Sequence, residues 1–486
     1  MSAEPAVLAR NTSYFTLALI TQKVISFLYF TFLARTLGPD VIGKYVLALA
    51  LTTIFSVLLD LGLSSVLTRE VARQRDQAEK LTQLIFGFKL IAMAIVVAGV
   101  VFAVHLLGYP LLTRQLVYVA CGVMVLDSFI LTTYSAIRGF HTLTWESFGT
   151  ILVQLTIAGV GLTFAQLTHD VRWFMGALLT GVCVHATYAL WQLPNRFSIN
   201  LVPRLSWPDF QQLARLAWPF ALAAILIRIY GYLDTVLLSK LASDHAVGIY
   251  SVAYKVTFSL QFIPSAFSAS LFPGFSLYFT ESPQKLADTF TRGLVYLTAI
   301  AVPLSLGAIV IAPVAISTLF PAFTEAILPL QVLMSSLPFL FATFPVGSLL
   351  PACNRQQRNT ANIAVATGLS IVLNLALIPH YGPLGAAVGS LLSTVTLLVL
   401  GWVVVRKLVR YDSRFLWGRL GRIVAAGVGM SLAAWWLVQY MHAAAATLIA
   451  GVVYLVLLVI WGGVTKRELW SLAQLIFKSK PGTTAV

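Results

Sequence analysis

Two basic residues, Lys23 and Arg228, stand out in this sequence because each interrupts a long apolar stretch. A shift of 205 residues places one on the other. The same shift aligns four further pairs, which are Leu33 with Leu238, Arg35 with Lys240, Gly43 with Gly248 and Tyr45 with Tyr250. A cation inside an apolar helix costs about 2.5–3.5 kcal/mol on insertion scales, so it is a functional candidate. Lysine as a point charge and arginine as a two-pronged donor both suit phosphate, so the pair predicts an anion site shared by two related halves.

Four other charged residues of the apolar stretches fall into two sets at matching depth. At a helix rise of about 1.5 Å per residue, Asp60 and Lys89 lie at equal distances from the turn between the two helices that carry them. Asp234 and Lys255 lie equally far from another. Both sets are interpreted as structural ion pairs between consecutive helices, provided that the side chains face each other. Lys255 is also kept as a third, weaker candidate for the anion site.

Asp127 has no partner of matching depth in its own hairpin and lies near the predicted midplane, as do Lys23 and Arg228. A carboxylate at this depth can carry a coupling ion, H⁺ or Na⁺, and a structural counter-ion role, including a salt bridge to Lys23, is the alternative. Four polar residues recur at helical spacing and therefore form a stripe along one face of a helix. This pattern predicts that the face lines a cavity rather than lipid. The stripe consists of Gln22, Lys23, Ser26 and Tyr29.

The composition identifies the elements that must position these residues. Of the 486 residues, 59% are hydrophobic and 10% are charged, against about 25% charged in soluble domains. Apolar windows of about 20 residues, long enough to cross a bilayer, begin near residues 12, 43, 82, 115, 148, 173, 213, 246, 290, 327, 360, 384, 419 and 443. We therefore expect an all-α, polytopic membrane protein with about fourteen transmembrane helices.

The distribution of the cations predicts the orientation. Of the 32 Lys and Arg residues, twenty-three fall on the side of the N-terminus, five on the other side and four within the helices. Because cations gather on the cytoplasmic side, both termini are expected there. The net charge of +15 is thus explained by topology, and no nucleic-acid partner is expected. The first apolar run is too long for a signal peptide and is expected to be retained.

The repeat predicts the domain organisation. Residues 1–209 form a first six-helix lobe with its linker, residues 210–412 a second lobe, and residues 413–486 two extra helices with a cytoplasmic tail. The two pseudo-symmetric lobes are expected to surround a central cavity. The segment 194–212, rich in proline and carrying a tryptophan, is interpreted as a partly interfacial linker. Three scattered cysteines predict neither a disulfide framework nor a metal site.

Four segments carry a resemblance to a known family. They are LARTLGPDVIGKY (33–45), DLGLSSVLTREVAR (60–73), LDTVLLSKL (233–241) and VGIYSVAYKV (247–256). The sequence resembles the polysaccharide transporters of the multidrug/oligosaccharidyl-lipid/polysaccharide superfamily, which are flippases for lipid-linked O-antigen and related oligosaccharides. The resemblance implies a prokaryotic plasma (inner) membrane, a cation-lined cavity to which Lys23, Arg228 and Lys255 belong, and glycan polymerase or assembly proteins as partners.

The sequence shows no enzymatic signature, and no catalytic residue, metal or cofactor is expected. The function predicted is a flippase that moves a polyprenyl-(di)phosphate-linked oligosaccharide from the cytoplasmic to the outer leaflet by alternating access. Three alternatives stay open. They are a lipid II flippase, a cation-coupled multidrug exporter of the same superfamily, and a non-transporting lipid-glycan scaffold for a polymerase complex.

Overall fold

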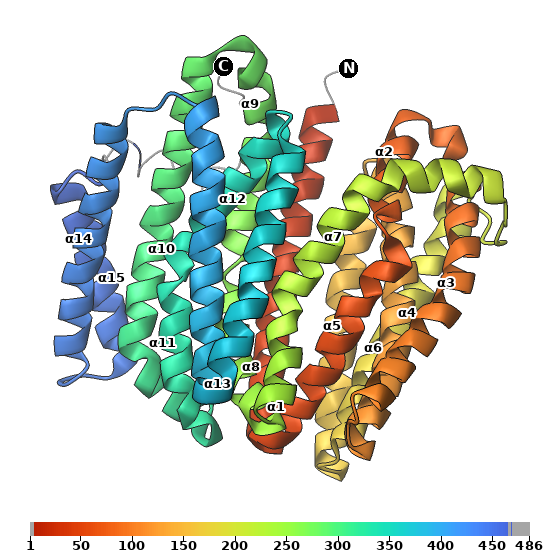
Figure 1. The fold of residues 1–486 in the computed structure, drawn as a ribbon, viewed down its shortest axis with the longest axis horizontal. Helices are drawn as coiled ribbons and strands as arrows, with labels where there is room; N and C mark the ends of the chain where they lie inside the picture. The colour runs from red at the N-terminus through yellow and green to blue at the C-terminus, as the bar shows by residue number, and fades with distance from the viewer. Residues whose placement is uncertain (1–3, 465–467, 469–486) are drawn as a thin grey trace. The chain divides into compact units, whose positions relative to one another are not determined.

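The computed structural model describes residues 4–464 and residue 468, and the described residues form helices and no strand (Figure 1). In chain order the elements are α1 (Glu4–Asp60), α2 (Leu63–Arg73), η1 (Arg75–Gln77), α3 (Ala78–Leu106), α4 (Leu111–Gly139), α5 (Thr144–Leu167), α6 (Val171–Phe197), α7 (Trp207–Leu241), α8 (Asp244–Ser259), α9 (Phe262–Glu281), α10 (Pro283–Leu319), η2 (Pro321–Ala326), α11 (Ile327–Ser335), α12 (Leu337–Ala352), α13 (Gln356–Leu408), α14 (Ser413–Leu437) and α15 (Ala443–Ile460). The all-α prediction is confirmed. The predicted C-terminal tail lies outside the described residues.

Twelve stretches of the described chain are long and apolar enough to cross a membrane. Two of them, α1 and α13, are long enough to cross twice, and each is broken in its middle. The breaks are at Gly38 (φ 75°) and Gly382 (φ 52°), where glycine accepts a positive φ without a steric penalty. A proline follows at Pro39 and Pro383. Each of these helices therefore folds back, and the twelve stretches make the predicted fourteen crossings.

Contacts divide the chain into two compact units, residues 1–248 and 249–486. In the first unit, α1 packs against α4, α5 and α7, while α6 packs against α4 and α5. The helix α7, assigned from the sequence to the second lobe, thus belongs to the first compact unit. The helices that carry Lys23, Asp127 and Arg228 are consequently neighbours within one unit.

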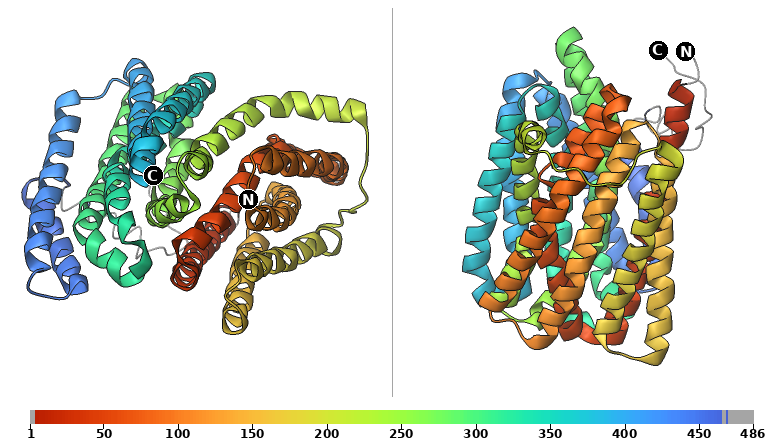
Figure 2. Two further views of the ribbon diagram at one scale, coloured as in Figure 1. Left: turned by 60° about the horizontal axis from the view of Figure 1, so that its bottom comes forward. Right: turned by 90° about the vertical axis from the view of Figure 1, so that its right-hand side faces the viewer.

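The linker between α6 and α7 is shorter than predicted. Instead of spanning 194–212, it covers only residues 198–206, because α6 continues past Pro194 to Phe197 and α7 begins at Trp207. Pro208 sits in the first turn of α7, where a proline suits a helix start because the amide it lacks would be unpaired anyway. The first part of α7 crosses the ends of α2 and α3 before the helix turns to run beside α1 (Figures 1 and 2).

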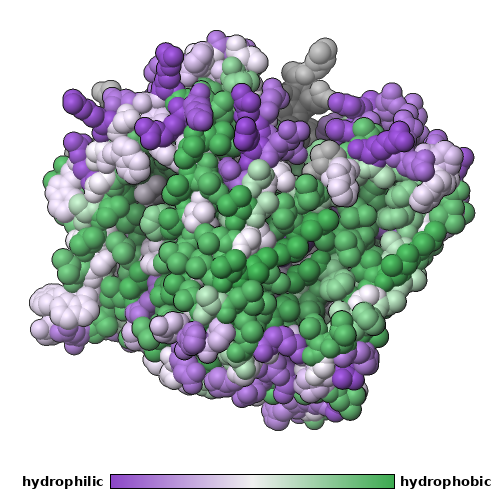
Figure 3. All heavy atoms as spheres, in the orientation of Figure 1, coloured by the Kyte–Doolittle hydropathy of each residue, from purple (hydrophilic) through white to green (hydrophobic). Residues whose placement is uncertain are grey.

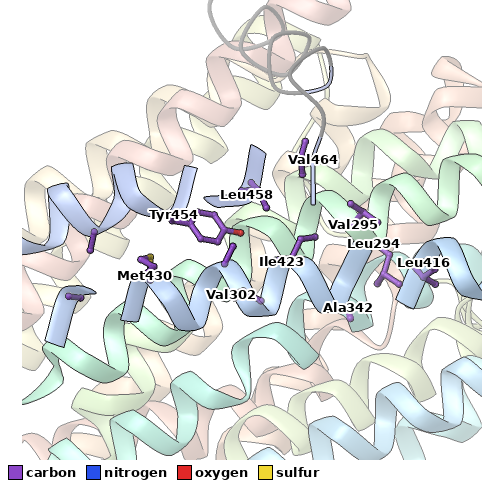
Figure 4. Close-up of a cluster of buried hydrophobic side chains, with 13 residues drawn as sticks. Leu294, Val295, Val302, Ala342, Leu416, Ile423, Met430, Tyr454, Leu458 and Val464 are labelled. Atoms are coloured by element: carbon purple, nitrogen blue, oxygen red, sulfur yellow. The ribbon is translucent and has the colours of Figure 1, made fainter. Parts of the chain in front are cut away.

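The second unit contains a buried apolar cluster formed largely by α10, α14 and α15. Val302, Met430 and Tyr454 belong to it, and the Tyr454 hydroxyl donates a hydrogen bond to the carbonyl of Ala299 (2.7 Å) (Figure 4). A second cluster joins α9, α10, α12 and α13 through Phe275 and neighbouring residues. The two extra C-terminal helices are thereby attached to α10.

The surface of each unit has the pattern of a membrane protein. Apolar residues cover the middle of the helices, and hydrophilic residues gather at their ends (Figure 3). Large apolar side chains such as Leu28 (62% exposed), Ile95 (68%) and Leu432 (64%) point outward. In a membrane these side chains would meet lipid rather than water.

Candidate functional site

Lys23 lies on α1 at the border between a face with exposed apolar side chains and a face that packs against other helices. Val24 and Leu28 are exposed on the first face, whereas Gln22, Lys23 and Ser26 are half-buried. The polar stripe predicted from the sequence is therefore partly accessible.

Tyr29 differs from the rest of the stripe because it is enclosed. Its ring packs against α5, where a Cβ atom on Gly161 would stand 2.1 Å from the hydroxyl oxygen. This hydroxyl is buried and has no hydrogen-bond partner among the described residues. Tyr29 thus anchors α1 to α5.

Arg228 lies on α7 with its side chain exposed. The helix packs against α1 in the same unit. The repeat therefore places its two cations on helices that touch.

The other repeated residues occupy matching environments. Leu33 and Leu238 are 1% and 0% exposed, and Tyr45 and Tyr250 are 6% and 1% exposed. The apolar and aromatic pairs of the repeat are thus core residues, whereas its cations at 23 and 228 stay accessible. Such accessibility is required of side chains that bind a ligand.

Asp127 lies on α4, and its side chain is exposed. The neighbouring Ser128 is buried. An accessible carboxylate in the middle of a membrane helix faces protein or water rather than lipid. The helix α4 packs against α1, which carries Lys23.

Asp60 and Lys89 form an ion pair. Lys89 Nζ lies 3.1 Å from Asp60 Oδ1 and donates a second hydrogen bond to the carbonyl of Ser128 (2.9 Å). The Ser64 hydroxyl also donates to Asp60. Because the Lys89 side chain is only 1% exposed, this cation is engaged in packing α3 against α1 and α4. Asp234 is buried on α7 in the first unit and Lys255 is half-buried on α8 in the second, so their pairing stays a prediction.

The structure adds a buried polar group that sequence reasoning did not identify. Tyr134 and His185 share a hydrogen bond of 3.1 Å between α4 and α6. Gly149 of α5 makes room for it, because a Cβ there would stand 2.2 Å from the tyrosine oxygen. Nothing in the spacing of these residues marks them as partners, since each lies on a different helix.

Charged residues at two turns also form contacts across the first unit. His245 Nδ1 lies 3.3 Å from Asp40 Oδ2, and Lys44 Nζ lies 3.9 Å from Asp244 Oδ2. A sequence signal existed for the first contact, because residues 40 and 245 are separated by the 205-residue shift of the repeat.

The chain is similar in sequence to known proteins. The family model described as "Polysaccharide biosynthesis protein" matches residues 8–279. A probable low-salt glycan biosynthesis flippase of Haloferax volcanii is 24% identical over 393 residues, which cover 79% of this chain and 81% of that protein.

Two solved structures show a similar fold. The lipid II flippase MurJ in an inward closed conformation gives a TM-score of 0.77 at 14% identity and covers 94% of this chain and 99% of its own. A MOP superfamily transporter from Pyrococcus furiosus gives a TM-score of 0.60 at 12% identity and covers 84% of this chain and 98% of its own.

Proposed function

The chain belongs to the family of polysaccharide biosynthesis proteins, and we propose that it is a flippase for a polyprenyl-(di)phosphate-linked oligosaccharide. It would carry this lipid from the cytoplasmic to the outer leaflet of a prokaryotic plasma membrane, with both termini in the cytoplasm. The family, the named flippase relative and the membrane-spanning fold support transport of a glycan lipid. The polyprenyl carrier and the direction of transport rest on the family resemblance, and the repeated cations support the (di)phosphate.

One observation carries the proposal. Lys23 and Arg228 are equivalent residues of the repeat, they lie on two packed helices, and both remain accessible while the apolar and aromatic pairs of the repeat are buried. Two cations at such positions suit a (di)phosphate, since Lys supplies a point charge and Arg a two-pronged donor. Lys255 on α8 is proposed as a third, weaker contact.

The transport cycle follows from the chemistry of the substrate. The polyprenyl tail stays in lipid, while the charged headgroup and sugars pass through a cavity that opens alternately to each side. Dehydrating the phosphate is costly, and the cations offset that cost. Asp127 is proposed to bind the coupling ion, H⁺ or Na⁺. Glycan polymerase or assembly proteins are proposed to receive the product.

The test compares the lipid-linked glycans of cells that lack this protein with those of cells that carry the wild type or Lys23→Gln/Arg228→Gln. Mass spectrometry identifies the glycan lipid, and a membrane-impermeant glycosidase reports which face holds it. We expect one lipid (di)phosphate glycan to accumulate facing the cytoplasm in the null and in the double variant. Lys285→Gln/Arg215→Gln, two exposed cations elsewhere, serves as the control and should clear it.

The other outcomes are equally informative. If the double variant clears the glycan, the flippase stands and the cationic site is wrong. If nothing accumulates in the null, the flippase proposal is wrong, and drug sensitivity of the null then tests the exporter alternative. A scaffold would leave the glycan flipped but unpolymerised, and would not need the two cations.

A further inference from the structure

The segment that joins α13 to α14 in the second unit is strongly basic. It runs from residue 406 to residue 422 and includes the last turn of α13, a short connection and the beginning of α14 (Figure 1). We call it the basic connection. It holds one acid, Asp412, and six cations, which are Arg406, Lys407, Arg410, Arg414, Arg419 and Arg422.

Most of these cations are exposed and have no acidic partner. Arg419 is paired with Glu468 (2.9 Å). The other five are exposed, and they form no ion pair with any side chain that the structure describes. Asp412 instead accepts a hydrogen bond from the amide of Phe415 (3.1 Å) and so caps α14. Five positive charges of the basic connection are therefore left without a neutralising group among these side chains.

The rule that gathers cations on the cytoplasmic side does not account for this imbalance. That rule counts cations, and acids contribute little to it. The segment 69–80 of the first unit, for example, has four cations together with three acids, and both Arg69 and Arg73 contact Glu70. A segment can thus satisfy the rule and still be nearly neutral. The unpaired charge of the basic connection therefore indicates an anionic partner outside the chain.

One of the cations also lies where it disfavours its own helix. The N-terminus of a helix carries partial positive charge, so acids are favoured there and cations are not. The first turn of α14 nevertheless has no acid and carries Arg414. An anion bound at this place would compensate for both the arginine and the helix end.

Exposed aromatic side chains lie among the cations. Trp417 and Phe415 are both exposed. The Trp417 ring centre lies 6.0 Å from that of Trp402 in α13, and the Arg419 guanidinium carbon lies 4.6 Å from the centre of the Phe415 ring. Tryptophan rings gather at the level of the lipid headgroups. The rings therefore place the surrounding cations at headgroup depth.

We propose that the basic connection binds anionic phospholipid headgroups of the leaflet at this end of the helices, which the proposed orientation makes the cytoplasmic leaflet. Headgroup phosphates accept charge-assisted hydrogen bonds from arginine and lysine. Clusters of about four to eight such residues beside a membrane helix attract anionic lipids. The exposed rings favour a lipid over an acidic protein. The inference goes beyond the flippase function and does not depend on transport.

The experiment uses the fluorescence of Trp417 as its probe. The full-length protein is reconstituted into vesicles of equal parts phosphatidylglycerol and phosphatidylcholine, in which one lipid or the other carries bromine atoms that quench tryptophan. The contribution of Trp417 is the difference between the protein and its Trp417→Phe variant. We expect brominated phosphatidylglycerol to quench Trp417 more strongly than brominated phosphatidylcholine, because the anionic lipid is concentrated around this ring.

Neutralising part of the basic connection should reduce this preference. Lys407→Gln/Arg410→Gln/Arg414→Gln should lower the relative binding constant of phosphatidylglycerol at least about fivefold, since each cation near an anionic surface contributes about that factor. The matched control removes the same charges from exposed positions of the first unit and should leave the preference unchanged. It is Arg73→Gln/Arg75→Gln/Lys80→Gln.

Salt provides a measurement on the unmodified protein, which covers the case in which the triple variant fails to fold. The preference should fall steeply as the screening length shortens from about 10 Å at 0.1 M to about 3 Å at 1 M ionic strength. Inorganic pyrophosphate at constant ionic strength should not compete with the lipid.

Several results would overturn the proposal. Equal quenching by the two lipids in the unmodified protein would do so, and would leave an acidic protein as the alternative occupant. A preference that persists in the triple variant or at 1 M salt would show that these charges do not hold the lipid. An equal loss in the control would assign the preference to the total charge of the protein, and competition by pyrophosphate would indicate a site for a soluble anion.

Discussion

Lys89 Nζ lies 3.1 Å from Asp60 Oδ1, and the lysine side chain is 1% exposed while that of the aspartate is 18% exposed. The lysine also donates to a backbone carbonyl of α4. A buried charge of this kind is tolerated because its partner and its hydrogen bonds replace water. The structure therefore accounts by packing for the charge of Lys89, which is one of the four cations that interrupt the apolar stretches.

The first prediction concerns this ion pair. Lys89→Met or Asp60→Leu should each destabilise the protein by about 3–5 kcal/mol, since each leaves one charge buried without its partner. The double variant Lys89→Met/Asp60→Leu should be less destabilised than either single variant. Thermal unfolding in detergent measures the order. Lys285→Met, at an exposed position of α10, is the control, and a double variant as unstable as the sum of the singles would contradict the prediction.

The second prediction concerns the two repeated cations. Lys23→Gln and Arg228→Gln should each slow transfer of a lipid-linked glycan about ten- to a hundredfold, the equivalent of losing one hydrogen bond to a charged group at about 1.5–3 kcal/mol. Arg228→Lys should lose less than Arg228→Gln, because it keeps the charge and loses only the two-pronged geometry. Reconstituted vesicles with a glycan lipid measure the rates. Equal rates for Arg228→Lys and Arg228→Gln would show that charge is not what the site uses.

The residues behind these two predictions could be identified from the sequence, but their contacts could not. The turn at Gly38 and the depth of Asp60 and Lys89 follow from local chemistry and from counting helix rise. That the two side chains face each other depends on the rotation of α1 and α3, which no local rule specifies. The same holds for Gly43 and Gly248. The 205-residue shift relates them in the sequence, but the approach of Gly43 to the carbonyl of Asp244 and of Gly248 to that of Pro39 is a property of packing.

The linker prediction was wrong for a related reason. The sequence predicts irregular chain at Pro194 and Pro208, yet Pro194 lies inside α6 near its end and Pro208 lies in the first turn of α7. A proline in the first turn of a helix looks, in sequence, like a proline that breaks one. Only the position of Ser206, which precedes α7, gives a hint of the helix start.

The third prediction concerns the linker as it lies in the structure. The Arg204 amide donates to the carbonyl of Gln83 (3.1 Å), and a Cβ on Gly87 would stand 2.3 Å from the carbonyl oxygen of Arg204. Gly87→Ala should therefore displace residues 199–206 from α3 and increase their hydrogen exchange. Gly99→Ala in the same helix, where the nearest atom would be 3.9 Å away, is the control. Unchanged exchange in Gly87→Ala would mean that α3 does not hold the linker.

The fourth prediction is a pH dependence at the end of this linker. Hydrogen bonds from Lys80 and then Ser206 hold the pKa of Asp209 below its ordinary value. A lowered carboxyl pKa means that the contact with Lys80 is fully present above the ordinary value, about 3.9, and is lost as the pH falls through the lowered one. Hydrogen exchange of residues 199–210, corrected for the intrinsic rate, should rise in that window. Lys80→Gln should abolish the step, and a step that persists in this variant would assign it to another group.

The fifth prediction concerns the contact that fixes α1 beside α5. A Cβ on Gly161 would stand 2.1 Å from the Tyr29 hydroxyl oxygen and 2.6 Å from two ring carbons, so Gly161→Ala should destabilise the protein by about 1–3 kcal/mol through overpacking. Tyr29→Leu should rescue it because the ring is gone, whereas Tyr29→Phe should not, because the ring carbons remain.

Gly159→Ala on the same helix, where a Cβ would meet nothing within 4 Å, is the matched control. It should be neutral or stabilising, since alanine favours a helix over glycine by up to about 1 kcal/mol. Thermal unfolding of the four variants measures the pattern. Rescue by Tyr29→Phe would mean that the hydroxyl alone causes the clash, and equal loss in Gly159→Ala and Gly161→Ala would mean that the tyrosine is not the cause. Because Tyr29 lies on the same stripe as Lys23, this contact also fixes the part of α1 that carries this lysine.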